Sequence, residues 1–300
     1  MAGDLEFLCN ICGTTCRCPI EQLTREEQSC SKCGSNVRTR SLLRILSQEL
    51  FQVDLPLADF PSLKSLRGLG ISDVPQYAGA LAEKFDYRNT FHDRAPQFDL
   101  MHPHESDLGT YDFVIVSDVL EHVPPPAEAG FRNAYSLLKP GGVVIVTVPY
   151  SIEDAGTIEH FPKLREFAVT SLGGQAVLVN RTADGEFQVF DNLTFHLGAT
   201  PSLEMREYSE KGLKALLAGV GFDGIQWYGE DYLPYGIKWG EQWSLPLVLR
   251  KGARSFGAGT IRELMGELAD ARERADRHKS EFDLLNQRRW VKLGKSLGAL

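Results

Sequence analysis

The stretch from Tyr111 to Tyr150 places the strongest constraint on the fold of this chain. YDFVIVSDV (111–119) and GVVIVTVPY (142–150) are short apolar runs rich in β-branched residues, and each predicts a buried strand. The residues between them suit a helix followed by a Lys-Pro-Gly-Gly turn. Short apolar strands also alternate with helical stretches from about Leu63 onward. This alternation is typical of βαβ units and predicts an α/β fold with a mostly parallel sheet.

The segments around this α/β region indicate further parts of the chain. SLLRILSQELF (41–51) suits an amphipathic helix that connects the N-terminal segment to the core. Residues 151–203 interrupt the alternation with two β-rich runs around Asp184-Gly185, which predict a hairpin in an insertion that caps a site. A helix at 209–222 and a strand at 224–230 then resume the pattern. The predicted parts are 1–37, 38–62, 63–253 with its insertion at 151–203, and 254–300.

All six cysteines lie in one short N-terminal segment. Two Cys-x2-Cys pairs stand seventeen residues apart, which is the spacing of a tetrathiolate zinc site. Four thiolates leave no open position on the metal, so we expect a structural Zn²⁺ in a zinc ribbon. Cys16 and Cys18 are additional cysteines, and one of them is an alternative to a member of the first pair. The predicted ligands are Cys9, Cys12, Cys30 and Cys33.

The charge of the chain bears on its partners and location. A net charge of −8 argues against a general nucleic-acid-binding protein. Arg38, Arg40 and Arg44 form a modest basic patch after the cysteines, but packing or partner docking is the preferred interpretation of that region. The chain begins without a signal-peptide pattern and has no run of eighteen apolar residues. We therefore expect a cytoplasmic protein, with a peripheral place at the inner face of the membrane as an alternative.

The C-terminal part has a heptad-like pattern. Apolar positions step by three and four from Ile261 to Leu285 and predict either pairing between chains, hence a homo-oligomer, or a lone surface helix. The last residues, RRWVKLGKSLGAL (288–300), have the pattern of a weak interfacial helix that touches an acidic membrane surface or a partner. Gly294 and Gly298 lower its helicity, so disorder in the unbound chain is the alternative.

Three motifs together carry a resemblance to a known family. LKSLRGLGISD (63–73) runs into Gly68-x-Gly70, DVLEHV (118–123) follows the predicted strand at 111–119, and LLKPGG (137–142) precedes the next strand. In this order and separation they resemble the class I S-adenosylmethionine (SAM) dependent methyltransferases. That resemblance implies a Rossmann-like fold and methyl transfer from SAM. The cysteine ribbon with FDYRNTF, EHFP and FHLG is similar to a bacterial subgroup associated with cell-surface glycan assembly.

The resemblance also implies the residues that contact SAM. A Gly68-Leu69-Gly70 turn would let the backbone approach the methionine part of SAM. Leu66 stands where the family has an acidic residue and Ser72 where it favours a third glycine, and Asp73 is a candidate to compensate. For the ribose, Asn89, Thr90 and Asp93 remain alternatives, whereas Asp99 is expected at the adenine amino group or as a polar strand end. The implied cofactor residues are Gly68, Gly70, Ser72, Asp73, Asn89, Asp99, Ser117, Asp118 and Glu121.

Methyl transfer needs a nucleophile held in line with the sulfonium methyl and a site that excludes water. A hydroxyl acceptor also needs a base, and a neutral imidazole can accept its proton near neutral pH. His122, His160 and His196 are the candidate catalytic histidines, with capping or surface histidines as the alternative. Tyr150 is a candidate acceptor contact, and Glu159 is a candidate to orient an imidazole.

Three functions follow from these motifs. We expect methylation of a hydroxyl of a saccharide or glycan intermediate. The first alternative is an N-methyltransferase or a small-molecule methyltransferase. The second is a non-catalytic scaffold with a degenerate SAM site. The sequence does not identify the acceptor.

Overall fold

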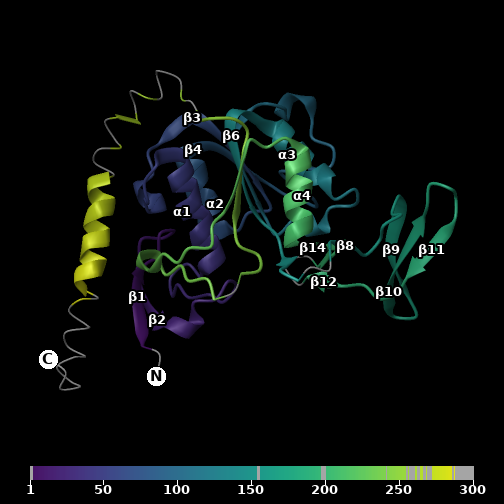
Figure 1. Cartoon of the computed structure of the whole chain (residues 1–300), viewed down its shortest axis with the longest axis horizontal. Helices are drawn as coiled ribbons and strands as arrows, with labels where there is room; N and C mark the ends of the chain where they lie inside the picture. The colour runs from purple at the N-terminus through teal and green to yellow at the C-terminus, as the bar shows by residue number, and fades with distance from the viewer. Residues whose placement is uncertain are drawn as a thin grey trace. The chain divides into compact units, whose positions relative to one another are not determined.

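A computed structural model describes residues 3–153, 156–196, 201–240, 242–254, 256, 261, 264–265, 268, 272–285 and 287. The chain divides into two compact units (Figure 1). The first unit comprises residues 1–89, 227–241 and 254–300, and the second comprises residues 90–226 and 242–253.

The first unit begins with an antiparallel hairpin of β1 (Asp4–Leu8) and β2 (Thr15–Pro19), followed by the short helix η1 (Ile20–Gln22). Helix α1 (Val37–Phe51) follows and begins four residues before the predicted start. A capping box explains the earlier start. The Thr39 amide donates to Oδ1 of Asn36 at 2.9 Å, and the Asn36 amide donates to Oγ1 of Thr39 at 3.1 Å. Nearly every residue of α1 is buried, so the helix belongs to the core of this unit.

The arginines of α1 serve internal contacts, which agrees with packing, the preferred interpretation of this region, and not with a basic patch. Arg40 is fully buried, and its guanidinium donates to the carbonyl oxygens of Ser35 at 2.8 Å and Gly236 at 2.9 Å. Because residues on nearly all sides of α1 are buried, its arginines contact other groups of the protein. The other two pair with carboxylates at 2.9 Å, Arg38 with Glu26 and Arg44 with Asp54.

A strand-helix-strand segment follows α1 in the first unit. The short helix η2 (Leu57–Asp59) leads into β3 (Leu63–Ile71), which neighbours β4 (Phe85–Thr90) in the sheet. Helix α2 (Pro75–Lys84) connects the two strands and starts at a proline, a residue suited to the first turn because it has no amide hydrogen to leave unpaired.

The central strands of the second unit confirm the strongest expectation from the sequence. Strand β5 (Tyr111–Ser117) runs parallel to β6 (Leu138–Thr147), and α3 (Glu128–Leu137) connects them. Strand β16 (Leu247–Arg250) lies antiparallel on the other side of β6, so the sheet is mixed. The side chains from Phe113 to Val116 are fully buried, as expected for a strand covered on both faces.

The helix predicted near residue 209 is also present. Ser209 is the N-cap of helix α4 (Glu210–Val220), and its Oγ accepts from the Gly212 amide at 2.9 Å. The helix ends at Gly221, which has a φ of 106° and therefore suits a left-handed C-cap. Helices α3 and α4 pack against each other (Figure 1), and β15 (Gly224–Trp227) then reaches the edge beside β16.

The Lys-Pro-Gly-Gly segment, predicted as a turn before the strand, lies inside β6, where the pairing with β5 is irregular between Tyr111 and Phe113. Gly141 has a φ of 79°, in the left-handed region that favours glycine. A Cβ on Gly142 would lie 3.0 Å from the carbonyl oxygens of Lys139 and Tyr111. Both glycines are therefore required where β6 approaches β5.

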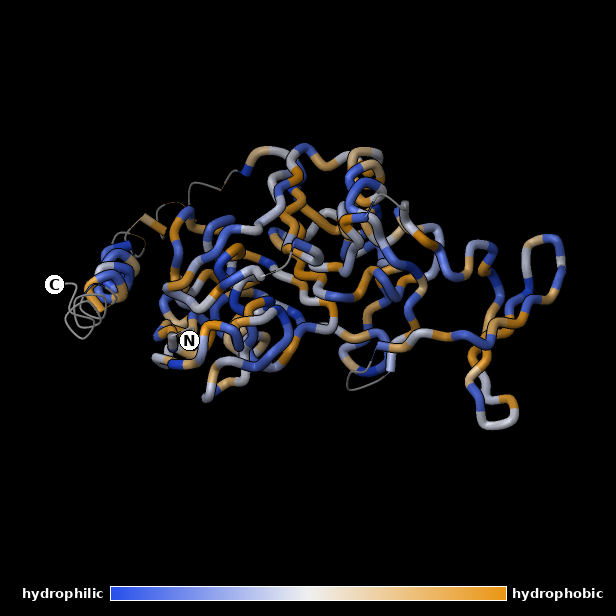
Figure 2. The backbone as a smooth tube through the Cα atoms, turned by 60° about the horizontal axis from the view of Figure 1, so that its bottom comes forward, coloured by the Kyte–Doolittle hydropathy of each residue, from blue (hydrophilic) through white to orange (hydrophobic). Residues whose placement is uncertain are grey.

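Residues 151–203 contain a small antiparallel sheet. Strands β10 (Gln175–Arg181) and β11 (Phe187–Phe190) form the hairpin expected around Asp184-Gly185. Strand β9 (Glu166–Leu172), which the sequence analysis did not predict, pairs with β10 across Gly173-Gly174. This sheet extends away from the rest of its unit (Figure 1), and polar and apolar residues both lie along it (Figure 2).

Short strands connect this sheet to the rest of the second unit. Strand β14 (Arg206–Ser209) lies between β7 (Tyr150–Ser151) and β8 (Ile158–Glu159), and β12 (Phe195–His196) pairs with β13 (Ser202–Leu203). A hydrophobic cluster holds these strands in place. Its buried members are Phe161, Leu178, Leu203 and Met205.

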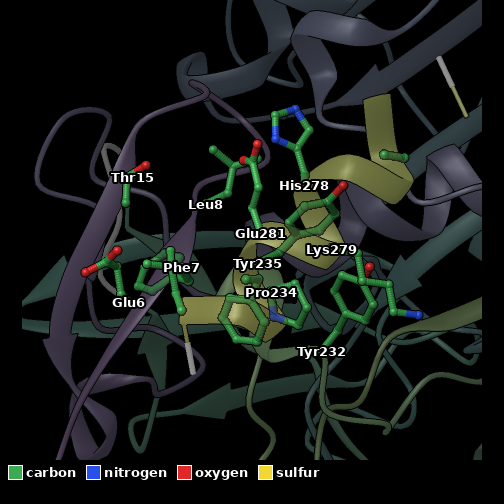
Figure 3. Close-up of a pocket in the computed structure, with 13 residues that line it drawn as sticks. Glu6, Phe7, Leu8, Thr15, Tyr232, Pro234, Tyr235, His278, Lys279 and Glu281 are labelled. Carbon is green, nitrogen blue, oxygen red and sulfur yellow. The ribbon is translucent and has the colours of Figure 1, made fainter. Parts of the chain in front are cut away.

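Residues 272–285 are helical and pack within the first unit. A pocket of ≈ 90 Å³ lies among this helix, β1 and η5 (Leu233–Tyr235), as Figure 3 shows. In the described residues, four positions of the predicted heptad seam therefore face their own unit: Ala275, His278, Phe282 and Leu285. Pairing between chains stays a prediction. The predicted interfacial helix at 288–300 lies outside the described residues, and no helix in the described part is long and apolar enough to cross a bilayer.

Candidate functional site

Polar side chains join the carboxyl ends of β5 and β6. Ser117 Oγ lies 2.8 Å from Oγ1 of Thr147, which donates to Oδ1 of Asp118 at 2.9 Å. The Asp118 amide donates to the Thr147 carbonyl oxygen at 2.9 Å, and Asp118 has a φ of 51°. Ligands of open α/β folds bind at this edge of the sheet. The structure thus brings the predicted residues Ser117 and Asp118 together and adds Thr147, which the sequence analysis missed.

The next turn, η4 (Leu120–His122), presents Glu121 and His122. Glu121 is 1% exposed, and its Oε1 lies 3.8 Å from Nε2 of His122. Nδ1 of His122 lies 2.9 Å from the carbonyl oxygen of Leu203, an acceptor, so this ring nitrogen carries the hydrogen. Burial, together with the nearby His196, lowers the pKa of His122 below its usual value. The ring is therefore neutral at neutral pH and Nε2 keeps its lone pair.

Two of the three predicted catalytic histidines meet at one carboxylate, and the third packs against one of them. Nε2 of His196 lies 2.6 Å from Oε2 of Glu204, and Nε2 of His160 lies 2.8 Å from Oε1 of the same residue. The ring of His196 also meets the ring of His122 edge to face, with centroids 4.9 Å apart. We call Glu121, His122, His160, His196 and Glu204 the His-Glu cluster.

Glu204, the residue that connects two of these histidines, was not predicted from the sequence. It stands between Leu203 and Met205, whose side chains belong to the hydrophobic cluster. Because side chains alternate along extended backbone, the residue between two core positions points the other way. That alternation was readable in the sequence, but the histidines on the same side were not.

Arg206 holds the turn that carries Glu121 and His122. Its side chain is fully buried, and Nη1 donates to the carbonyl oxygens of Leu120 at 3.0 Å and Val123 at 2.6 Å. Nε donates to Oε1 of Glu159 at 2.6 Å. Glu159 therefore binds Arg206, and Glu204 takes the place next to His160 that was expected for Glu159.

Tyr150 does not have the free hydroxyl expected of an acceptor contact. The side chain is buried, its hydroxyl donates to the carbonyl oxygen of Gln242 at 3.0 Å, and it accepts from the Leu245 amide at 3.3 Å. The hydroxyl thus ties the loop before β16 to β7. This placement favours a structural role for Tyr150.

In the first unit, the turn expected at Gly68-x-Gly70 is wrong. Both glycines lie inside β3, and the chain leaves the strand only at Ser72. A Cβ on Gly70 would overlap the Tyr87 hydroxyl and the Asp73 carboxylate. Gly70 is therefore required by side chains that pack over β3. Ser72 has a φ of 62°, which explains why a glycine suits this position.

Asp73 and Asn89 fix the loop that follows β3. The hydroxyls of Tyr77, at 2.8 Å, and Tyr87 both donate to the Asp73 carboxylate. Burial raises the pKa of Asp73 to about 7, although these two hydrogen bonds oppose the shift. The Asn89 side chain accepts from the Asp73 amide at 3.0 Å and donates to its carbonyl oxygen at 2.8 Å. Both predicted cofactor residues thus shape the backbone beside Ser72.

Asp99 lies in a loop of the second unit. Its Oδ1 accepts from the Met101 amide at 2.8 Å, and Oδ2 lies 2.8 Å from Nδ1 of His102. Burial favours the neutral acid, but the hydrogen bonds from His102 and Met101 outweigh it and lower the pKa of Asp99 below its usual value. Asp99 is therefore an ionised hydrogen-bond acceptor at neutral pH.

The four predicted metal ligands lie together beside the β1–β2 hairpin. The Cys9 and Cys33 sulfurs are 3.7 Å apart, and the Cys12 and Cys30 sulfurs are 3.6 Å apart. All four lie within 4.8 Å of one another. In a tetrahedral site with Zn–S bonds of about 2.3 Å, neighbouring sulfurs lie about 3.8 Å apart. Donor type and spacing therefore fit Zn²⁺.

The two additional cysteines are not part of this group of four. Cys16 donates its S–H toward the Cys30 sulfur at 3.4 Å. Cys18 lies on β2, where it pairs with Leu5. This geometry places Cys16 next to a ligand and Cys18 among the packed residues of the hairpin.

Comparison with known proteins identifies the fold. The model of a family described as a methyltransferase domain matches residues 39–226. The chain belongs to this family. It is a SAM-dependent methyltransferase with a Rossmann-like fold and a mixed, mostly parallel central sheet. The match begins in α1 and ends in β15, so it covers the strand ends and the His-Glu cluster of this methyltransferase. Among curated proteins, none matches the sequence.

Solved structures of other methyltransferases resemble the chain. One is a 1,6-didemethyltoxoflavin-N1-methyltransferase from Burkholderia thailandensis, 14% identical, covering 71% of this chain and 79% of that chain with a TM-score of 0.38. A SAM-dependent methyltransferase from Clostridium acetobutylicum is 11% identical, with 69% and 97% covered and a TM-score of 0.36. A sugar N-methyltransferase from Streptoalloteichus is 11% identical, with 74% and 89% covered and a TM-score of 0.42. At this level of similarity, the substrates of these enzymes cannot be assigned to this chain.

Proposed function

We propose that this methyltransferase methylates a hydroxyl of a saccharide or glycan intermediate at the His-Glu cluster. The observation that carries the proposal is the Glu204 carboxylate, which binds His160 and His196 at 2.8 and 2.6 Å. Three imidazoles and two carboxylates in one place suit an acceptor that must lose a proton. The likeness of EHFP and FHLG to glycan-assembly methyltransferases supports a saccharide.

A hydroxyl is a weak nucleophile until its proton is removed. Proton transfer to a positioned side chain contributes roughly 10²–10⁴-fold to such a step. His122 is neutral and buried, and the Glu204 carboxylate lies within hydrogen-bond distance of Nε2 of both His160 and His196. The cluster thus offers both a proton acceptor and a carboxylate to stabilise the proton.

For SAM, we assign contacts in each unit separately. In the first unit, the backbone around Ser72 would contact the methionine part, because the hydrogen bonds between Asp73 and Asn89 fix this loop. In the second unit, Asp99 accepts from the adenine amino group, and Asp118 and Ser117 contact the cofactor at the end of β5.

An N-methyltransferase or a small-molecule methyltransferase is the alternative. A neutral amine already has the lone pair that attacks the methyl group, so it depends less on the His-Glu cluster than a hydroxyl does. The family membership supports an enzyme over the non-catalytic scaffold considered from the sequence.

We also propose that the four cysteines bind a structural Zn²⁺. Cys9, Cys12, Cys30 and Cys33 fill four coordination positions and leave none for a substrate. Arg40 lies buried near the group, bonded to Ser29 and Ser35, where its charge favours the thiolate forms of Cys9 and Cys30. The metal would then hold the hairpin against α1.

Calorimetry with SAM and S-adenosylhomocysteine, followed by transfer of a labelled methyl group to hydroxylated and amino acceptors, tests the proposal. We expect Asp99→Asn to weaken SAM binding, with Asp223→Asn, an exposed aspartate of the same unit, as the control. His196→Ala should bind SAM normally and lose transfer. No binding at millimolar SAM would refute the proposal, and label on an amine nitrogen would favour the alternative.

A further inference from the structure

We infer that Glu121, His122 and His196 form a site for a divalent transition-metal cation, separate from the four cysteines. Each of the three residues offers one ligand atom, and these atoms lie within 4.8 Å of one another. All three residues belong to the second unit, whereas the cysteines belong to the first. The existence of the site follows from its own geometry, and its role rests on the proposed function.

Both histidines are held in the tautomer that a metal ligand needs. Nδ1–H of His122 donates to the Leu203 carbonyl oxygen at 2.9 Å, which leaves the lone pair on Nε2. Nε2 of His196 faces the Glu204 carboxylate at 2.6 Å and must donate to it, which leaves the lone pair on Nδ1. Metal-bound histidines almost always donate their other N–H to a backbone carbonyl or a carboxylate. This pair has one partner of each kind.

The protein also fixes the positions of these ligands. Oε1 of Glu204 lies 2.8 Å from Nε2 of His160, and this contact fixes the carboxylate whose Oε2 faces His196. Glu204 is therefore a positioning residue for His196. Arg206 fixes both ends of the η4 turn through the Leu120 and Val123 carbonyl oxygens. Glu121 is further fixed by its backbone, because its carbonyl oxygen accepts from the Met205 amide at 2.8 Å. Such pre-ordering lowers the entropy lost when an ion binds.

Two imidazoles and one carboxylate define the class of ion. This donor set suits Zn²⁺, Mn²⁺, Fe²⁺ or Co²⁺, whereas Mg²⁺ and Ca²⁺ prefer oxygen ligands alone. Three protein ligands leave coordination positions open, as in catalytic metal sites. The four thiolates, by contrast, close their own site. The two groups of ligands therefore suit two different tasks.

The open positions suit an acceptor with neighbouring hydroxyl groups. A saccharide 1,2-diol would bind the ion through its oxygens, and the ion would lower the pKa of the hydroxyl to be methylated. In the transfer, the bond from the methyl carbon to sulfur breaks while the bond to the acceptor oxygen forms. Sulfur keeps the electron pair, SAM becomes S-adenosylhomocysteine, and the hydroxyl proton passes to His160, the histidine of the cluster that does not bind the ion, and then to solvent.

Titration of the full chain with Mn²⁺, followed by the electron paramagnetic resonance signal of free Mn²⁺, tests the site. Mn²⁺ is a suitable probe because thiolates select softer metals. We expect one Mn²⁺ per chain in the wild type. His196→Ala should weaken this binding at least about 100-fold, and Glu204→Gln about 10–100-fold, the range seen when the carboxylate behind a ligand is changed. His104→Ala, an exposed histidine bonded to Ser106 in the same unit, should bind Mn²⁺ as the wild type does.

Zinc content gives a second measurement that does not need activity. The wild type should hold two Zn²⁺ per chain, His196→Ala one, and Cys30→Ser one. Absence of Mn²⁺ binding in the wild type, or equal binding in His196→Ala, would overturn the inference. Circular dichroism of His196→Ala and Glu204→Gln verifies that each variant is folded, and Glu204→Gln keeps all three ligands.

SAM binding measured on the same samples separates this inference from the proposed function. Cation binding without SAM binding would support the metal site and refute the methyl transfer. SAM binding with hydroxyl methylation that is unchanged by a chelator would refute the role of the ion. Methylation that a chelator abolishes and Mn²⁺ restores in the wild type, but not in His196→Ala, would support both.

Discussion

Oε2 of Glu204 lies 2.6 Å from Nε2 of His196. The two residues come from β12 and from the short link between β13 and β14, which the β12–β13 pairing brings together. This contact orients the His196 imidazole, so its removal should affect methyl transfer and not SAM binding.

Glu204→Gln should reduce methyl transfer and leave SAM binding intact. The amide keeps the shape of the side chain but removes the negative charge that orients His160 and His196. We expect kcat/KM to fall about 10–100-fold. The matched control is Glu207→Gln, an exposed neighbour on β14, for which kcat/KM should not change. Equal rates for the two variants would contradict the positioning role of Glu204.

Arg206→Met should destabilise the second unit. The change removes the donors to Leu120 and Val123 and leaves Glu159 without its buried partner. Breaking a buried ion pair from one side costs about 3–5 kcal/mol. Arg181→Met breaks an exposed pair with Glu166 and should cost at most about 1 kcal/mol. Urea unfolding of both variants measures the difference, and similar values would argue against the role of Arg206.

Asp73 should make stability depend on pH. Burial raises the pKa of its folded-state carboxyl to about 7, above the value in the unfolded chain. The native state therefore holds this proton more tightly, and the free energy of unfolding should fall as pH rises from about 4 to about 7. Asp73→Asn should remove this part of the slope in urea unfolding, whereas the exposed Asp86→Asn should retain it. A wild-type slope that persists in Asp73→Asn would contradict the assignment.

Gly70→Ala should be destabilising for a reason unrelated to SAM. The added Cβ would overlap the Tyr87 hydroxyl and the Asp73 carboxylate, and such overpacking costs about 1–3 kcal/mol. In a Tyr87→Phe background part of the overlap disappears, so Gly70→Ala should cost less there. A double-mutant cycle by thermal or urea unfolding measures this coupling. Strictly additive effects would show that Tyr87 is not what excludes a side chain at Gly70.

Cys30→Ser and Cys16→Ser should differ in zinc content at the cysteine group. Cys30 is one of the four sulfurs that lie within 4.8 Å of one another, whereas Cys16 only donates toward Cys30 at 3.4 Å. We expect loss of this Zn²⁺ and a lower melting temperature for Cys30→Ser, and retention of the metal in Cys16→Ser. Loss of zinc in both variants would make Cys16 a ligand.

Local patterns predicted the elements, and their boundaries depended on caps and contacts. The apolar runs at 111–119 and 142–150 became β5 and β6 because β-branched runs of this length are stable only in a buried sheet. The start of α1 was missed although Asn36-x-x-Thr39 is a readable capping box. Strand β9 was missed because its side chains are exposed, and only Gly173-Gly174 marked its turn.

The candidate site divides in the same way. The residue types of the histidines and cysteines identified them as candidates, because imidazole and thiolate groups have few other roles in such patterns. The glycines at 68 and 70 were misplaced because the motif specifies small residues but not what packs over them. Tyr87 and Asp73 occupy the space beside Gly70. Asp73 precedes α2 in the sequence and Tyr87 follows it, so the two side chains meet only in the folded unit.

By itself, the sequence determined the α/β class, the methyltransferase family, the four-cysteine spacing and the histidines of the candidate site, because these depend on residue types at short separations. Only the tertiary structure decided that Glu204 joins His160 to His196, that Arg206 donates a hydrogen bond to Glu159, and that Arg40 is buried. These contacts join residues up to 196 positions apart, as from Arg40 to Gly236. Strand pairing and burial bring such residues together, and no local pattern records which polar group will need a partner once water is excluded.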